Sequence, residues 1–345
     1  MTGHHVARSF LGAAATAALL HCAGREPVSP AVNQAESITG STFAGRVALL
    51  SADSRRGRPT PSAELNLAAA YAVAQFGALG LAPGPATGFT QTWSTGGGDA
   101  PNAVGVLPGS DPGLAGEYVV FVAHLDHIGS VTSGEGCVAS GADTICNGAD
   151  DNASGSAAVL ELARAFAGLT PRPRRSLLFL LVSGEERGLL GSTYYVAHPA
   201  VPIAQTVAAV NLDMISRNAP DSLLVIGMGL SSLGARVGAV TAAHPELNLR
   251  PAGVGWPYGG SDHVPFGNAG VPTVMFFAGL HPDYHRPSDE LARTDADKGA
   301  RITRLAFYVG LDVANRTARP TWNAGAPAPV VPPAAGAWPG GGSSE

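Results

Sequence analysis

The sequence predicts an α/β fold in which a mostly parallel, mixed central sheet is covered by helices on both faces. Two observations carry this prediction: short runs of apolar and β-branched residues recur along the chain, and helical patterns lie between several of them. A third observation is that histidines and carboxylates follow several of these runs directly, at the side of such a sheet where ligands bind.

The first element expected is a helix over residues 62–79, where apolar positions recur at helical spacing until Gly80 ends the pattern. Six strands are expected, at Asn102–Leu107, Tyr118–Ala123, Ser176–Val182, Val207–Leu212, Ser222–Gly227 and Thr273–Phe277. Three more helices are expected, at Ser156–Phe166, Ser231–His244 and Lys298–Ala314. Nearly continuous apolar strands alternating with helices are typical of a parallel sheet buried on both faces.

Both ends of the 345-residue chain differ in composition from the part between them. Residues 1–24 contain a short apolar run behind a positively charged start, which is typical of a secretory signal peptide and too short to span a bilayer. Cys22 stands where a lipoprotein would carry its lipid-attached cysteine, although His21 replaces the small residue expected before it. Residues 324–345 are rich in Pro, Gly and Ala and predict a disordered tail. We therefore expect an exported protein, periplasmic or extracellular.

Charge and cysteine content narrow the class of protein further. The net charge is −5 and no basic run occurs, which does not fit a nucleic-acid-binding protein. Removal or lipidation of Cys22 would leave one pair, Cys137 and Cys146. In an exported protein a pair within one loop is expected to form a small disulfide. Two free thiols or a zinc pair are the alternatives, although zinc pairs normally have tighter spacing and a partner pair.

Histidines and carboxylates gather where the expected strands end. Because parallel strands present their carboxyl ends at one edge, these side chains are expected to lie close together. The residues concerned are His124, Asp126, His127, Asp150, Glu185, Glu186, Asp213 and His285.

This set of side chains is suited to binding metal. Imidazole and carboxylate groups are ligands that zinc takes, and there are too many here for one tetrahedral ion. They suit two ions roughly 3.5–4 Å apart, which share a bridging carboxylate. We expect Asp150 to be that bridge, because it stands just before a helix whose N-terminus favours an anion. Asp151 is then expected to point to backbone amides or solvent.

Glu185 and Glu186 form a second adjacent pair of acids. Consecutive side chains in an extended segment point in opposite directions, so one can bind metal while the other faces the substrate as general base. The alternative is a polar strand exit followed by the first turn of a helix, where glutamate is favoured. Signatures of other catalytic or nucleotide-binding classes are missing from the sequence, namely His-Glu-x-x-His, Gly-x-Ser-x-Gly and Gly-x-x-x-x-Gly-Lys.

Six segments of the chain together resemble a known family. They are HLD (124–126), NGADDNASG (147–155), SGEERGLLGS (183–192), NLDM (211–214), GGSDHVPF (259–266) and YHRPSDE (284–290). The chain resembles the secreted co-catalytic di-zinc aminopeptidases, a family that also holds the glutamate carboxypeptidase and transferrin receptor branches. The resemblance covers about residues 35–318 and implies a single di-zinc peptidase catalytic domain with a phosphorylase/hydrolase-like zinc-peptidase architecture.

The resemblance also implies a role for each matched residue. His124 and Asp213 would bind one zinc, Glu186 and His285 the other, and Asp150 would bridge them. Glu185 would be the general base that takes a proton from the attacking water, and Tyr284 would hydrogen-bond the tetrahedral oxyanion. Asp126 would orient His124. The resemblance assigns structural or supporting positions to His127, Asp262, His263 and Asp289.

Two departures from the family pattern stand out. The Cys137 and Cys146 pair is not part of the general pattern, and its acidic, glycine-rich loop is expected to line the substrate cleft. Many relatives carry a protease-associated domain inserted before the first zinc ligand. Here the segment before His124 is expected to be used for the first helix and the edge strands, so no such domain is expected.

The sequence thus predicts an exopeptidase that carries two Zn²⁺ per chain, acts on peptide substrates and removes their N-terminal residues. Three alternatives stay open at this point. A glutaminyl cyclase-like enzyme would use a single zinc, and a non-catalytic receptor-like relative would have lost ligands. A carboxypeptidase would need a cationic pocket for a carboxylate, which Arg217 or Arg286 could supply.

Overall fold

The computed structural model describes residues 1–3, 29–253 and 260–326. The helices run over Pro30–Glu36 (α1), Gly40–Leu50 (α2), Ala63–Ala78 (α3), Gly155–Ala167 (α4), Leu190–Ala197 (α5), Ser232–Ala243 (α6), His263–Asn268 (α7) and Ala296–Asn315 (α8). The strands run over Ala82–Pro83 (β1), Thr90–Ser94 (β2), Asp99–Leu107 (β3), Tyr118–His124 (β4), Ser176–Val182 (β5), Thr206–Asp213 (β6), Ser222–Ile226 (β7), Arg250–Gly253 (β8) and Thr273–Phe277 (β9). The expected signal peptide with Cys22, from residue 4 on, and the expected tail from residue 327 on lie outside the described residues.

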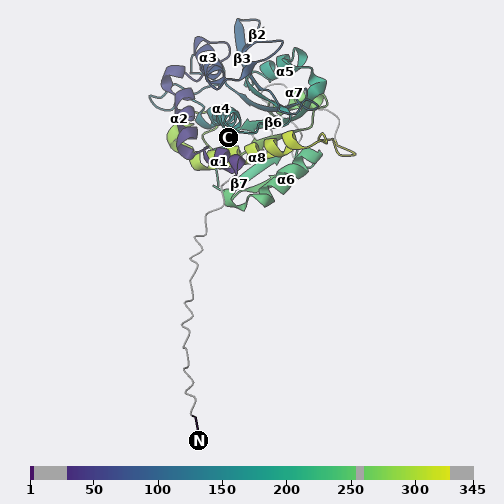
Figure 1. The fold of residues 1–345 in the computed structure, drawn as a ribbon. Coiled ribbons are helices and arrows are strands. Elements are labelled where there is room, and N and C mark those ends of the chain that lie inside the picture. Colours follow the sequence, from purple (N-terminus) through teal and green to yellow (C-terminus); the bar gives the residue numbers. More distant parts are fainter. Residues whose placement is uncertain (4–28, 254–259, 327–345) are drawn as a thin grey trace.

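The strands of the described residues form one mixed sheet, in the order β1-β3-β5-β4-β6-β9-β7-β8, with β2 paired to β3 (Figure 1). The four central strands β5, β4, β6 and β9 are parallel to one another. On either side of them β3 and β7 run antiparallel. The fold is therefore the predicted one, a mixed sheet whose centre is parallel.

All six expected strands are present, but the ends of the sheet were not predicted. β1 and β8 have only two and four residues, and the four residues of β8 are all at least partly exposed. Such short strands lack the apolar runs on which the prediction depends. The short helices α1, α5 and α7 were missed for a related reason, since each is shorter than three turns.

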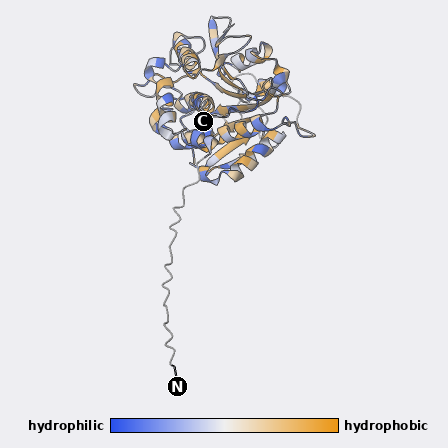
Figure 2. Ribbon diagram, in the orientation of Figure 1, coloured by the Kyte–Doolittle hydropathy of each residue, from blue (hydrophilic) through white to orange (hydrophobic). Residues whose placement is uncertain are grey.

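Alternate residues of the central strands face two separate apolar clusters. Val119 and Phe121 of β4 belong to the cluster that contains the inner faces of α3, α4 and α8. Val120 and Val122 belong to the cluster that contains Tyr195 of α5 and Phe266 of α7. Figure 2 shows apolar residues gathered at the centre of the molecule, where the sheet meets these helices. Burial on both faces explains why β5, SLLFLLV, is apolar along almost its whole length.

No helix within the described parts of the chain combines the length and the apolar character needed to cross a membrane.

Candidate metal centre

The carboxyl ends of the four parallel strands meet at one edge of the sheet and bring the expected side chains together. His124 is the last residue of β4, and Asp213 is the last residue of β6. Glu185 and Glu186 come shortly after β5, and His285 follows β9. This is the side of a parallel sheet on which ligands bind.

His124, Asp151 and Asp213 form the first group of donor atoms. His124 Nε2 lies 3.4 Å from Asp151 Oδ1 and 3.5 Å from Asp213 Oδ1. Donor atoms on one tetrahedral zinc, each about 2.0–2.1 Å from the ion, are about 3.3–3.5 Å apart. The three side chains therefore have the spacing that one ion requires.

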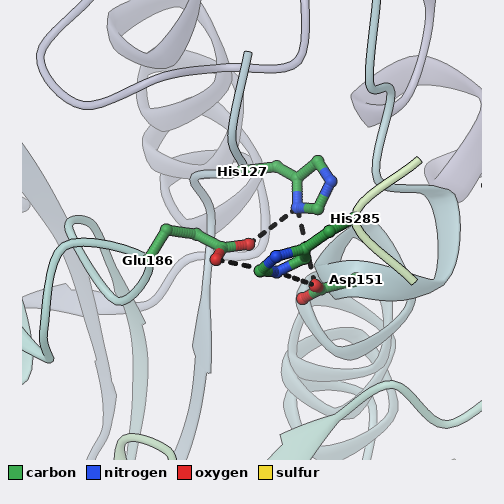
Figure 3. Close-up of side chains that lie close together, drawn as sticks. All are labelled: His127, Asp151, Glu186 and His285. Carbon is green, nitrogen blue, oxygen red and sulfur yellow. Dashed lines mark hydrogen bonds and ion pairs between the residues drawn. The ribbon is translucent and has the colours of Figure 1, made fainter. Parts of the chain in front are cut away.

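His127, Asp151, Glu186 and His285 form the second group (Figure 3). His285 Nε2 is 3.2 Å from Asp151 Oδ2 and 3.0 Å from Glu186 Oε2. One oxygen of Asp151 thus faces the first group and the other faces the second. A carboxylate in this position can bridge two ions.

The carboxylate between the two groups is Asp151, which corrects the expectation for Asp150. Asp150 Oδ1 accepts hydrogen bonds from the backbone N and the Oγ of Ser216, at 2.7 and 2.6 Å, and its Oδ2 lies 3.3 Å from His281 Nε2. The physical reason is local: the backbone at Asp151 is not helical (φ −106°, ψ 94°), so the neighbouring carboxylates leave the chain in different directions. Sequence spacing alone does not reveal which of two adjacent acids turns inward.

Two further residues hold the donor carboxylates in place. Asp289 accepts hydrogen bonds from the backbone N of Asp150 and of Asp151, both at 3.0 Å, and so fixes the segment before α4. Ser261 Oγ donates to Asp213 Oδ2 at 2.6 Å, while Asp213 Oδ1 has no hydrogen-bond partner. Asp289 was expected in a supporting position, whereas Ser261 was not expected at the site. Ser261 lies inside the matched segment GGSDHVPF, which is the one signal in the sequence that could have identified it.

Asp126 has partners other than the expected one. His124 Nδ1 is 3.7 Å from Asp126 Oδ1 but 3.2 Å from the Asp126 carbonyl oxygen, so the backbone oxygen is the nearer partner of the imidazole. The Asp126 carboxylate accepts hydrogen bonds from Thr60 Oγ1 at 3.1 Å and from the backbone N of Glu185 at 3.3 Å. Its contacts therefore position Glu185 more directly than His124.

The surroundings of Glu185 and Glu186 move their pKa values in opposite directions. Burial raises the pKa of Glu185 well above its usual range, and repulsion from Glu186 adds to this although His124 opposes it. Burial acts in the same direction on Glu186, but attraction to His285 and hydrogen bonds from His127 and His285 hold the pKa of Glu186 well below its usual range. Two carboxyls shifted apart in this way are suited to different tasks, one exchanging a proton and the other staying ionised.

Besides Glu185, Tyr284 is the other side chain at this edge for which a catalytic role is expected. Its ring stacks on that of His285, with centroids 3.8 Å apart. Burial, followed by repulsion from Asp151, raises the pKa of Tyr284, so its hydroxyl stays protonated and can donate a hydrogen bond. Asp262 and His263 are fully buried and belong to neither donor group.

The residues of this centre fit divalent metal ions. The carboxylates of Asp151, Glu186 and Asp213 converge in a space where their side chains are at most 8 % exposed, so their mutual repulsion is poorly screened. Asp213 Oδ1 is buried without a hydrogen-bond partner, which is costly unless another group interacts with it. All donors are nitrogen or oxygen, the set from which zinc sites are built.

Cys137 and Cys146, the pair that remains without Cys22, form the predicted disulfide. The bridge lies against the second donor group, because Cys146 Sγ is 3.8 Å from the carbonyl oxygen of His285. The backbone N of Cys146 also donates to the carbonyl of Gly129 at 2.9 Å. The disulfide therefore closes its loop directly beside the segment that carries Tyr284 and His285.

The chain is similar in sequence to one known family and to several known proteins. The model of the family described as Peptidase family M28 matches residues 102–310. Leupeptin-inactivating enzyme 1 of Streptomyces exfoliatus is 33 % identical over 228 residues, which are 64 % of this chain and 45 % of that protein. Aminopeptidase YwaD of Bacillus subtilis is 30 % identical over 161 residues, which are 43 % of this chain and 34 % of that protein. The chain thus spans less than half the length of these two relatives.

The fold is also found among solved structures. The LapA aminopeptidase of Legionella pneumophila matches with a TM-score of 0.66 at 19 % identity, over 84 % of this chain and 74 % of that chain. At this identity the match establishes that the two proteins share a fold.

Proposed function

The chain belongs to Peptidase family M28, and from this premise we propose that it is a zinc-dependent aminopeptidase with two zinc ions per chain. The observation that carries the proposal is the Asp151 carboxylate, which is shared between two groups of nitrogen and oxygen donors. His124 and Asp213 would bind one ion, Glu186 and His285 the other, and Asp151 both. YwaD and LapA are both named as aminopeptidases, which supports the choice of peptide N-termini as substrates.

Two side chains of this centre would carry out the remaining chemistry. Zinc bound here would polarise the scissile carbonyl and lower the pKa of the attacking water. Glu185, whose pKa is raised, would accept the proton of that water and deliver it to the leaving amine. Tyr284, whose hydroxyl stays protonated, would donate a hydrogen bond to the oxyanion of the tetrahedral intermediate.

The alternative activities fit these residues less well. A glutaminyl cyclase-like enzyme needs one zinc, whereas the donors around Asp151 would be enough for two, and a receptor-like relative would have lost some of these donors. A carboxypeptidase needs an available cation. Of the two arginines considered, Arg217 is already paired, because its Nη2 is 2.5 Å from Asp283 Oδ2 and its Nη1 is 3.8 Å from Asp289 Oδ1. Arg286 is exposed, and peptides with a blocked N-terminus test whether it serves a substrate carboxylate.

The proposal includes the setting of the enzyme. Residues 35–318 would form one catalytic domain without an inserted protease-associated domain, and residues 1–24 would direct export. The disulfide supports an oxidising compartment, because such bonds rarely persist in a reducing cytosol.

A panel of amino-acid p-nitroanilides, each offered with a free and with an acetylated N-terminus, tests this function. The zinc-loaded protein should cleave the free series and leave the acetylated series intact, and elemental analysis should find close to two zinc ions per chain. Release of C-terminal residues from N-blocked peptides would instead favour a carboxypeptidase. Formation of pyroglutamate from N-terminal glutamine, with one ion per chain, would favour a cyclase.

A further inference from the structure

His127 lies in the second donor group but has no role in the function proposed above. We propose that His127 is a positioning residue, which holds one oxygen of Glu186 by a hydrogen bond so that the other oxygen faces the metal position. This inference rests on the proposed metal centre and adds to it a residue that controls how strongly one of the two ions binds.

The distances around Glu186 divide its two oxygens between different partners. His127 Nδ1 is 2.7 Å from Glu186 Oε1, while His285 Nε2 is 3.0 Å from Glu186 Oε2. The contact of 2.7 Å is that of a charge-assisted hydrogen bond. Nδ1 is the donor, because an ionised carboxylate can only accept.

The imidazole of His127 is held firmly enough to fix its partner. Its side chain is fully buried, and its ring meets that of His285 edge-on, with centroids 5.5 Å apart. Gly148, at φ +59°, lies on its other side, and a Cβ there would be 2.5 Å from His127 Cγ. The glycine in NGADD therefore makes room for this ring.

The arrangement has a consequence for metal binding. The Nδ1 of His127 is 3.6 Å from Asp151 Oδ2, so it faces both carboxylates of the second group. Without the hydrogen bond, Glu186 could turn about its terminal torsion, and the entropy of fixing it would then oppose metal binding. Partners that orient a metal ligand in this way are typically worth about 10–100-fold in affinity.

Zinc affinities of the metal-free protein, measured by competition with a chromophoric chelator, test this role. We expect His127→Ala to weaken one of two sites by about 10–100-fold and to leave the other unchanged. His127→Asn should restore most of the affinity, because the asparagine amide can donate from nearly the position of Nδ1. His198→Ala, at an exposed histidine away from the site, is the matched control and should bind zinc as the wild type does.

Other results would overturn the inference and separate it from the proposed function. Unchanged affinities in His127→Ala would exclude a positioning role. Complete loss of one ion in His127→Ala without recovery in His127→Asn would make His127 a direct ligand instead. If His127→Ala did not fold, His127→Asn would decide, with affinity near that of the wild type in support and loss of affinity against. Glu186→Gln, measured in parallel, should weaken the same zinc site. The zinc content of the wild-type protein tests the centre itself, because a wild-type protein that binds no zinc would remove the proposed function as well.

Discussion

At the scale of single residues, the adjacent glutamates Glu185 and Glu186 are expected to have different roles, proton transfer and metal binding. Glu185→Gln should keep the fold and both zinc ions while kcat falls by roughly 10²–10⁴, because an amide cannot accept the proton. KM should change little, since a base acts mainly in the transition state. Glu186→Gln should weaken one zinc site, with part of the activity returning in excess zinc. Zinc content and kcat, measured side by side for both variants, check this. Loss of metal in Glu185→Gln with both ions kept in Glu186→Gln would reverse the two assignments.

The neighbouring acids Asp150 and Asp151 allow an equally sharp comparison. Asp151→Asn should impair both zinc sites, because each donor group uses one oxygen of this carboxylate. Asp150→Asn should keep both ions, because its amide oxygen can still accept the hydrogen bonds from Ser216. Zinc content after dialysis against metal-free buffer distinguishes the two variants. The opposite pattern would return the bridging role to Asp150.

At the scale of elements, a buried carboxylate joins two helices that cover the sheet. Glu161 of α4 is 1 % exposed and accepts hydrogen bonds from Arg46 Nε at 2.6 Å and from Thr42 Oγ1 at 2.8 Å, both on α2. Arg164, one turn along α4, donates to it at 2.7 Å. Burial acts to raise the pKa of Glu161, but hydrogen bonds from the two arginines outweigh burial and lower it.

The lowered pKa of Glu161 predicts a pH-dependent contribution to stability. Because the unfolded chain binds the proton more readily, this contribution is present above the usual glutamate pKa of about 4.3 and is lost as the pH falls through the lowered value. Glu161→Gln should therefore lower the free energy of unfolding by about 1.5–3 kcal/mol at pH 7 and by less in acid. Urea unfolding at pH 7 and at acidic pH measures this difference in stability, with Glu246→Gln, at an exposed position, as control. An equal loss of stability at both pH values would contradict the explanation.

At the scale of the whole molecule, metal binding should stabilise the fold, because the donors come from the ends of several strands. β4 and β6 end at His124 and Asp213, and the segment before α4 supplies Asp151. A ligand present at 100 times its dissociation constant stabilises the folded state by about 2.7 kcal/mol. Removing zinc with a chelator should therefore lower Tm by at least about 5 °C.

Differential scanning calorimetry with and without chelator measures this shift. Asp151→Asn serves as the control, because a protein that binds zinc poorly should respond little to the chelator. Equal melting temperatures for the wild-type protein in both conditions would mean that no strongly bound metal links the strands.

The sequence by itself determined the central strands and the types of side chain at their ends. β4, β5, β6 and β9 could be predicted because burial on both faces demands nearly continuous apolar runs. Their carboxyl ends then placed His124, Glu185, Glu186, Asp213 and His285 at one edge, because parallel neighbours end on the same side.

Only the tertiary structure decided which side chains meet at that edge. Asp151 rather than Asp150 turns inward because of the backbone angles of an irregular segment, which Asp289 fixes from far along the chain. His127 reaches Glu186 because Gly148 leaves room for its ring. Directions in regular strands follow a simple alternation that can be read from sequence. Directions in irregular segments depend on contacts between residues distant in sequence, and these exist only in the folded molecule.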